Sequence, residues 1–295
     1  MPERPSKLKI YSLIALMTTM WSSNYIVAKY ALREFPPLLA SGLRMVVAGF
    51  IMIFVYGWHH TNRNIPPWTR QDIRLLAFLG TIGVGLNQLF FVTGISMTTV
   101  SHAAIMIGLT PVTVLVLAAF MGLENLSIVR LLGMVTAIGG VAVLRLTASK
   151  SDGATLAGDL LVFLASFTFA VFTVRGKKET KRLGGVVVNT FAYVGTAVAM
   201  LPITLGYSLD FDYSRVTWIA WMSVAYMAVF PSVVCYSIYY YALTHVPASR
   251  VSAFSYLQPL LATVMAIPLL GEHPTRSLVA GGALVLLGVF LAERG

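Results

Sequence analysis

An internal repeat constrains this chain more than any other feature of its sequence. From Val100 to Val141, a Thr-Pro step in an apolar run is followed by an acidic residue and then by a run with spaced glycines. The same pattern returns 148 positions later without a gap, so that Ser101, Leu109, Pro111, Glu124, Gly133 and Gly140 are matched by Ser249, Leu257, Pro259, Glu272, Gly281 and Gly288. Repeats of this kind dictate architecture. Because each unit is a pair of apolar segments, the chain is predicted to contain two copies of one membrane module.

Composition supports a membrane protein. Of the 295 residues, 57% are hydrophobic and 11% are charged, whereas a soluble domain carries roughly 25% charged residues. The apolar segments reach the length of about 20 residues that a transmembrane helix needs. The net charge is +10, but the basic residues cluster at segment ends, which argues against nucleic acid as a partner. The single cysteine, Cys235, lies inside an apolar segment, so no disulfide framework is expected.

Hydropathy predicts an all-α polytopic protein with ten transmembrane helices. The expected spans are 10–32, 38–58, 73–94, 99–121, 127–146, 157–175, 185–207, 216–241, 247–270 and 275–292. Residues 1–150 and 151–295 then form two five-helix repeats. Because five is odd, the two copies must cross the membrane in opposite senses. Inverted repeats of this type surround a central cavity and expose it to each side alternately.

The basic residues also predict the orientation. If the N-terminus lies inside, the inner loops carry fourteen Lys and Arg residues and the outer loops carry six, with Arg44 inside a span and not counted. Because Lys and Arg are enriched in cytoplasmic loops, both termini are predicted to be cytoplasmic.

Several motifs in this framework resemble those of a known family. They are Trp21-Ser22-Ser23-Asn24-Tyr25 in the first span, Arg44 eight residues after Pro36, the Pro111…Glu124…Gly133…Gly140 pattern with its copy, and Gly158-Asp159-Leu160-Leu161 at the start of the second half. Together they resemble the EamA-type transporters of the drug/metabolite transporter superfamily. This resemblance implies a basket of ten spans in a bacterial inner membrane, with a cavity lined by spans 1, 3, 4, 6, 8 and 9. It also implies export of amino acids or other small metabolites.

The match departs from the family pattern in two places. Phe169 stands where the family commonly has Trp, and Leu287 replaces the glycine that would match Gly139. Neither departure threatens the predicted fold, but the first leaves the chemistry of the cavity open.

Candidate substrate-binding residues are polar or aromatic side chains within the spans. Trp21, Asn24 and Tyr25 share one side of the first helix, and a polar Asn at that depth needs a partner inside the protein. Aromatic side chains also gather at membrane interfaces without forming a site. The full predicted set is Trp21, Asn24, Tyr25, Asn87, Gln88, Phe91, His102, Met106, Phe169, Phe172, Tyr236, Tyr240, Tyr256 and Gln258.

Three charged or titratable side chains have two interpretations each. His102 is either a histidine hydrogen-bonded at the membrane interface or a substrate contact or proton site. Arg44 either extends its stem toward the outer interface or attracts an anionic group of the substrate, and the same alternatives apply to Lys29. All eleven carboxylates lie at loops or span ends. A proton relay usually needs a titratable group deep in the membrane, so facilitated export or exchange is expected.

Four further residues have predicted structural roles. Pro111 and Pro259 are expected to bend their helices, either as fixed kinks or as hinges for alternating access. Glu124 and Glu272 are expected to cap the helix that follows each of them. The glycine-rich run 80–85 lies within a span and follows no strand, so it predicts close helix packing rather than nucleotide binding.

The sequence therefore predicts a secondary transporter that exports small metabolites, with amino acids as the first substrate class. An exporter of drugs, nucleobases or purine derivatives with the same fold is the alternative. The scarcity of carboxylates argues against a strongly cationic substrate. An intramembrane enzyme is disfavoured, because no nucleophile–base pair or cluster of acids lies within the spans, and a non-transporting scaffold is disfavoured by the polar residues in mid-span. No cofactor and no metal are expected. The expected partners are a small-molecule substrate and the lipid bilayer, with one monomer enclosing the pathway.

Overall fold

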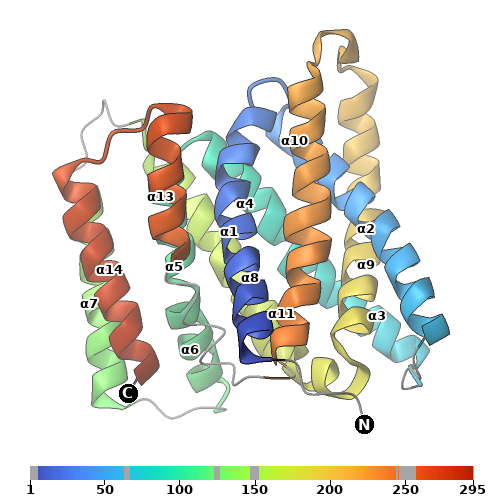
Figure 1. Ribbon diagram of the computed structural model, residues 1–295, viewed down its shortest axis with the longest axis horizontal. Coiled ribbons are helices and arrows are strands. Elements are labelled where there is room, and N and C mark those ends of the chain that lie inside the picture. Colours follow the sequence, from blue (N-terminus) through green and yellow to red (C-terminus); the bar gives the residue numbers. More distant parts are fainter. Residues whose placement is uncertain are drawn as a thin grey trace.

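The computed structural model describes residues 6–62, 67–122, 127–146, 153–243, 245 and 257–294, and the regular structure of these residues is entirely helical. The helices are α1 (Lys7–Ala31), α2 (Pro37–Asn62), α3 (Arg70–Gly80), η1 (Thr81–Leu86), α4 (Asn87–Ser96), α5 (Val100–Gly108), α6 (Thr110–Phe120), α7 (Ile128–Leu146), α8 (Leu156–Leu183), α9 (Gly185–Leu209), η3 (Tyr213–Arg215), α10 (Trp218–Val229), η4 (Phe230–Val234), α11 (Cys235–Leu243), α13 (Leu257–Leu270) and α14 (Arg276–Arg294). The first turn of α1 and the last turn of α14 lie at the same end of the bundle (Figure 1).

The helices have the length and the surface of a multi-pass membrane protein. Six helical runs are long and apolar enough to cross a membrane, namely 37–61, 70–96, 100–120, 156–183, 185–209 and 218–239, and three shorter apolar helices cover 128–144, 257–270 and 276–292. Large apolar side chains such as Phe120 and Phe54 are 86% and 62% exposed. Such a surface is stable where the surrounding solvent is lipid.

Helical runs occur at all ten predicted positions within the described residues, with one clear difference in length. The sixth was predicted to end at residue 175, but α8 continues to Leu183. In its basic last turn Arg182 forms ion pairs with Asp72 and Glu179. The predicted start of the ninth span, at residue 247, lies outside the described residues.

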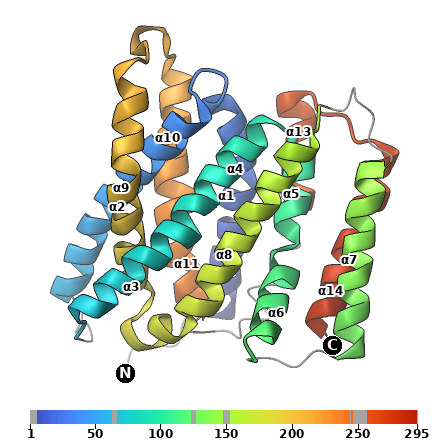
Figure 2. The same cartoon turned by 180° about the vertical axis from the view of Figure 1, so that it is seen from behind.

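Helices from the two halves of the sequence interleave. α7 packs along α14 at one edge of the bundle and α2 packs along α9 at the other, while α4 lies against α8 and α1 contacts both α10 and α13 (Figure 1, Figure 2). Each half therefore finds most of its packing surface on the other half, rather than forming a core of its own.

The repeated glycines meet one another in the α7–α14 contact. A Cβ atom on Gly133 would lie 2.6 Å from the Gly288 carbonyl oxygen, and one on Gly140 would lie 2.7 Å from that of Gly281. At these positions the two backbones touch, so no larger residue fits. A Cβ atom on Gly139 would meet nothing within 4 Å. This explains why its counterpart in the second copy, Leu287, carries a large side chain.

The two halves also interrupt their helices at matching places. Residues 82–86 of η1 and 230–234 of η4, which are counterparts in the repeat, are both π-helical. Such segments are rare and often lie at functional sites. The η1 region packs closely, since a Cβ atom on Gly83 would lie 2.1 Å from that of Phe172 and one on Gly80 would lie 2.3 Å from the Ala192 Cα. The packing role predicted for the glycine-rich run is thus confirmed.

The predicted break at Pro111 is also present. α5 ends at Gly108 and α6 begins at Thr110, with Pro111 in the first turn of α6. This is the position where a proline without an N–H group is tolerated. Pro259 is the third residue of α13, and the residues directly before that helix lie outside the described part of the chain. Whether either proline acts as a hinge stays a prediction.

Candidate functional site

A cavity of about 640 Å³ lies within the bundle. Its size falls in the range of roughly 300–1,000 Å³ that is typical of small-molecule sites. Helices from all six predicted lining spans contribute to its wall, and α2, α7 and α14 contribute as well. The wall includes these residues predicted from the sequence: Trp21, Asn24, Tyr25, Arg44, Asn87, Gln88, Phe91, Pro111, Phe169, Tyr236, Gln258 and Pro259.

Three other predicted residues lie away from the cavity wall. His102 is buried against Asp159 near the end of the bundle, and Met106 is buried in the apolar core around α5. Phe172 packs on Gly83, so both Met106 and Phe172 serve packing. Tyr256 and Glu124 lie outside the described residues, and the side chain of Tyr240 is not described either.

The aromatic part of the wall is a set of rings in mutual contact. The Trp21 ring lies 5.7 Å from the Tyr236 ring and 6.1 Å from the Tyr239 ring, measured between centroids. The Phe169 ring lies 6.3 Å from the Tyr236 ring, again measured between centroids. The Trp21 indole N–H donates to the Pro231 carbonyl at 3.2 Å, which fixes the ring where η4 interrupts its helix. These rings offer an apolar surface with edge-to-face geometry.

A chain of two amides projects from the start of α4. The Asn87 side-chain nitrogen donates to the Ala165 carbonyl at 2.7 Å, and the Gln88 nitrogen donates to the Asn87 side-chain oxygen at 2.8 Å. A backbone carbonyl only accepts hydrogen bonds, so this chain fixes the orientation of both amides. The Gln88 side-chain oxygen is buried and has no hydrogen-bond partner among the described residues.

Arg44 is turned into the bundle, with only 2% of its surface exposed. Its Nε donates to the Ser232 hydroxyl at 3.2 Å, while its Nη1 finds no partner in the described part of the chain. The interpretation in which the Arg44 stem extends toward the outer interface is therefore wrong, because α2 places this residue against η4. Lys29 has a structural contact instead, since its Nζ donates to the Thr98 carbonyl at 2.6 Å.

The wall is built from matching positions of the two repeats. Six pairs of lining residues stand 148 positions apart: Trp21 and Phe169, Tyr25 and Thr173, Gln88 and Tyr236, Phe91 and Tyr239, Thr110 and Gln258, and Pro111 and Pro259. Matching helices of the two halves thus present matching faces to one space.

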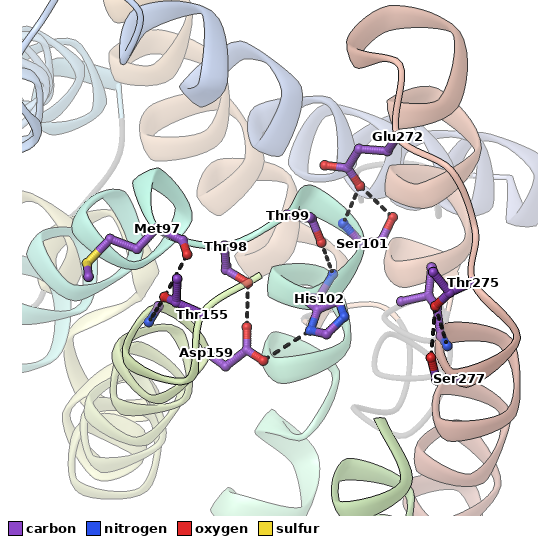
Figure 3. A network of polar contacts seen from close by, with 12 residues as sticks. Met97, Thr98, Thr99, Ser101, His102, Thr155, Asp159, Glu272, Thr275 and Ser277 are labelled. Atoms are coloured by element: carbon purple, nitrogen blue, oxygen red, sulfur yellow. Dashed lines mark hydrogen bonds and ion pairs between the residues drawn. The ribbon is translucent and has the colours of Figure 1, made fainter. Parts of the chain in front are cut away.

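A second polar region lies at the end of the bundle opposite the termini (Figure 1, Figure 3). There the Asp159 carboxylate, buried in the first turn of α8, accepts a hydrogen bond from the Thr98 hydroxyl and lies 3.0 Å from the His102 Nδ1. The Thr155 hydroxyl donates to the Met97 carbonyl at 2.7 Å. We call these residues, together with Ser101 and Glu272, the end cluster. The prediction that each carboxylate lies at a loop or span end holds for Asp159, but the sequence did not reveal its burial or its partner.

Glu272 caps a different helix from the one predicted. Its carboxylate accepts the Val100 and Ser101 backbone N–H groups at 2.6 and 3.1 Å, and the Ser101 hydroxyl at 2.8 Å. These groups form the N-terminus of α5, whereas the helix after Glu272 is α14, which Thr275 caps at 3.1 Å. The end of α13 lies beside the start of α5 (Figure 3), so the carboxylate reaches the positive pole of its neighbour.

Among the described residues, no group of three His, Cys, Asp or Glu side chains has the arrangement of a metal site.

The sequence pattern of the EamA-like transporter family matches this chain twice, over residues 8–146 and 156–293. The chain belongs to the EamA-like transporter family. It is 28% identical to "Uncharacterized transporter YetK" of Bacillus subtilis (strain 168) over 95% of this chain and 86% of the relative. It is 25% identical to "Probable amino-acid metabolite efflux pump" of Salmonella typhimurium over 95% and 93%. A solved crystal structure matches in fold, with a TM-score of 0.65 at 18% identity, covering 98% of each chain.

Sequence reasoning overlooked several lining residues of this EamA-like transporter that the repeat itself indicates. Thr173 and Tyr239 are the counterparts of Tyr25 and Phe91, which were predicted, and Thr110 is the counterpart of Gln258. Applying the 148-residue offset to each predicted residue would have found all three.

Proposed function

We propose that this protein is a secondary transporter of a bacterial inner membrane that exports small metabolites, with amino acids as the first substrate class. The observation that carries the proposal is the cavity of about 640 Å³, walled by matching positions of both repeats. A secondary transporter places its substrate at the interface of its two repeats. The name of the Salmonella relative as an amino-acid metabolite efflux pump supports amino acids as the substrate class.

We further propose that the two repeats are inverted and that the protein works by alternating access. α7 and α14 are matching helices that run antiparallel to each other (Figure 1). Their glycines contact reciprocally, Gly133 with Gly288 and Gly140 with Gly281. A two-fold axis in the membrane plane relates helices in this way.

The two ends of the bundle differ as alternating access requires. The cavity reaches Arg130 in the first turn of α7 and Ala292 near the end of α14, which is the end that holds both chain termini. The end cluster ties α4, α5, α8 and the α13–α14 connection together at the opposite end. With the termini in the cytoplasm, this arrangement corresponds to a cavity open to the inside and closed to the outside. One monomer then encloses the whole pathway, and substrate leaves through the end cluster by facilitated export or exchange.

Flux in proteoliposomes tests this function. Purified protein is reconstituted, and uptake of a panel of radiolabelled amino acids is compared between wild type, Trp21→Ala in the cavity wall, and Trp218→Ala, a tryptophan that is 73% exposed. We expect flux for some amino acids in the wild type and in Trp218→Ala, and its loss in Trp21→Ala. If no amino acid crosses while the protein is folded and a nucleobase or drug panel does, the alternative substrate class is correct. If nothing crosses, the proposal fails.

A further inference from the structure

We propose that the cavity binds the zwitterionic backbone of an α-amino acid with an apolar side chain. In this site Arg44 binds the carboxylate, and the side-chain oxygen of Gln88 accepts a hydrogen bond from the ammonium group. The inference rests on the proposed function, since it names the chemistry by which the same cavity selects its substrate.

Arg44 provides the hydrogen-bond donors for the carboxylate of the ligand. A guanidinium presents several N–H donors in a planar fork that suits a carboxylate. In this protein Ser232 uses only Nε, and Nη1 has no partner among the described residues although the side chain is 98% buried. A buried charge without a compensating partner is strongly unfavourable. A carboxylate bound in the cavity supplies the missing negative charge together with an acceptor.

Gln88 provides a hydrogen-bond acceptor for the ammonium group of the ligand. The contacts from Asn87 to the Ala165 carbonyl and from Gln88 to Asn87 leave the Gln88 side-chain oxygen as the free end of the amide chain. A carbonyl oxygen can only accept, so its complement is an N–H donor such as an ammonium group. The side-chain oxygen of Asn24 on the same wall is likewise buried without a partner within the described residues.

The charge of the cavity wall also favours a ligand that carries a carboxylate. Arg44 supplies a buried positive charge to the wall, and the described residues of the wall include no carboxylate. A ligand that carries only a positive charge would face repulsion in a site of low dielectric constant. A ligand with a carboxylate is attracted, and its ammonium group is held by neutral acceptors. The aromatic rings of Trp21, Phe169 and Tyr236 then offer their apolar surface to the side chain of the ligand.

Three related compounds separate the groups that bind. Phenylalanine has the carboxylate, the ammonium group and an aromatic ring, whereas 3-phenylpropionate lacks the ammonium group and phenethylamine lacks the carboxylate. Their affinities are measured on the purified wild-type protein from the rise of its melting temperature with ligand concentration, because a ligand that binds only the folded state stabilises it by an amount that grows with the logarithm of the ligand concentration relative to its Kd. We expect phenylalanine to bind best, 3-phenylpropionate at least about tenfold more weakly, and phenethylamine most weakly of the three.

Variants then assign the groups to residues. Arg44→Gln is expected to weaken phenylalanine binding at least about tenfold and to abolish the advantage of phenylalanine over phenethylamine. Arg44→Lys, which keeps the positive charge without the planar fork, is expected to retain part of that advantage. Gln88→Leu is expected to abolish the advantage of phenylalanine over 3-phenylpropionate. Asn189→Leu is the matched control, because Asn189 also has a buried, unpartnered side-chain oxygen but does not line the cavity.

The inference is overturned if phenethylamine binds the wild type as tightly as phenylalanine does, if none of the three compounds binds, or if folded Arg44→Gln binds phenylalanine normally. The comparison among the three compounds uses only wild-type protein, so it decides the matter even if an Arg44 variant does not fold. If phenylalanine binds but no compound of the panel is transported, the proposed function is wrong and the proposed amino-acid site is still supported. If amines are transported as fast as amino acids, the protein is a transporter and the proposed amino-acid site is wrong.

Discussion

In the cavity, Gln88 and Arg44 each retain a buried polar atom without a partner among the described residues, whereas at the far end of the bundle the carboxylates of Glu272 and Asp159 have partners from other helices. Both regions consist of polar groups in an apolar bundle, where an unmade hydrogen bond is costly. In the end cluster, the polar groups form hydrogen bonds with one another, and these bonds hold several helices together. In the cavity, these polar atoms form no hydrogen bond with the described part of the protein, so a bound ligand can supply their partners.

The comparison also separates stability from function. Groups paired within the protein contribute to the free energy of unfolding, and their loss should be seen mainly in stability. Groups that await a ligand contribute little to stability or oppose it, and their loss should be seen mainly in affinity. Three substitutions test this division, in order of their expected effect on stability.

Glu272→Ala should have the largest effect on stability. The change removes three hydrogen bonds to the N-terminus of α5 and should lower the free energy of unfolding by about 2–3 kcal/mol. The melting temperature of the purified protein measures this, with Asp210→Ala, an exposed carboxylate at the end of α9, as the control. Phenylalanine affinity should stay within about twofold of the wild type. An unchanged melting temperature with lost affinity would reverse the roles assigned to the two regions.

Asp159→Asn should have an intermediate effect. Asparagine keeps an oxygen for the Thr98 hydroxyl but loses the negative charge beside His102, so a loss of about 1–2 kcal/mol is expected. Flux through the variant should still follow the substrate gradient alone, as in facilitated export. A flux that a pH gradient drives in the wild type but not in Asp159→Asn would show instead that this buried pair couples transport to protons.

Gln88→Leu should have the smallest effect on stability. It removes an unpartnered acceptor from the interior but also takes the donor away from the Asn87 oxygen, and these opposing changes should leave the free energy of unfolding within about 1 kcal/mol of the wild type. Phenylalanine affinity should nonetheless fall by about tenfold. A variant that is clearly destabilised yet binds normally would place Gln88 with the structural groups.

The sequence predicted the helices and most of the cavity wall because both follow from local signals. Apolar segments of sufficient length located the helical runs, and polar residues such as Asn87 and Gln88 in mid-span pointed to the interior because lipid offers them no partner. The repeat held further information that was not used, since Thr173, Tyr239 and Thr110 line the cavity and are counterparts of predicted lining residues.

Contacts between distant residues were beyond such reasoning. Glu272 caps a helix that begins about 170 residues earlier in the chain, and no local pattern reveals that the end of α13 lies beside the start of α5. The direction of Arg44 depends on the packing of α2 against η4. Gly139 and Gly140 are adjacent in sequence, yet only Gly140 touches α14. The counterpart of Gly139 in the second repeat can therefore be a large residue, Leu287.

If substrate bound in the cavity leaves by the opening of the end cluster, a reversible cross-link across that cluster should stop transport without preventing binding. Ser101→Cys and Glu272→Cys place one thiol on each of the two segments whose side chains now form a hydrogen bond of 2.8 Å, and because cysteine is shorter than glutamate, a short bifunctional methanethiosulfonate reagent joins the two thiols through reducible disulfide bonds. After cross-linking, the double variant should still bind phenylalanine but carry no radiolabelled amino acid across the proteoliposome membrane, and reduction should restore flux. Flux that continues unchanged through the cross-linked protein would show that substrate leaves the cavity by another route.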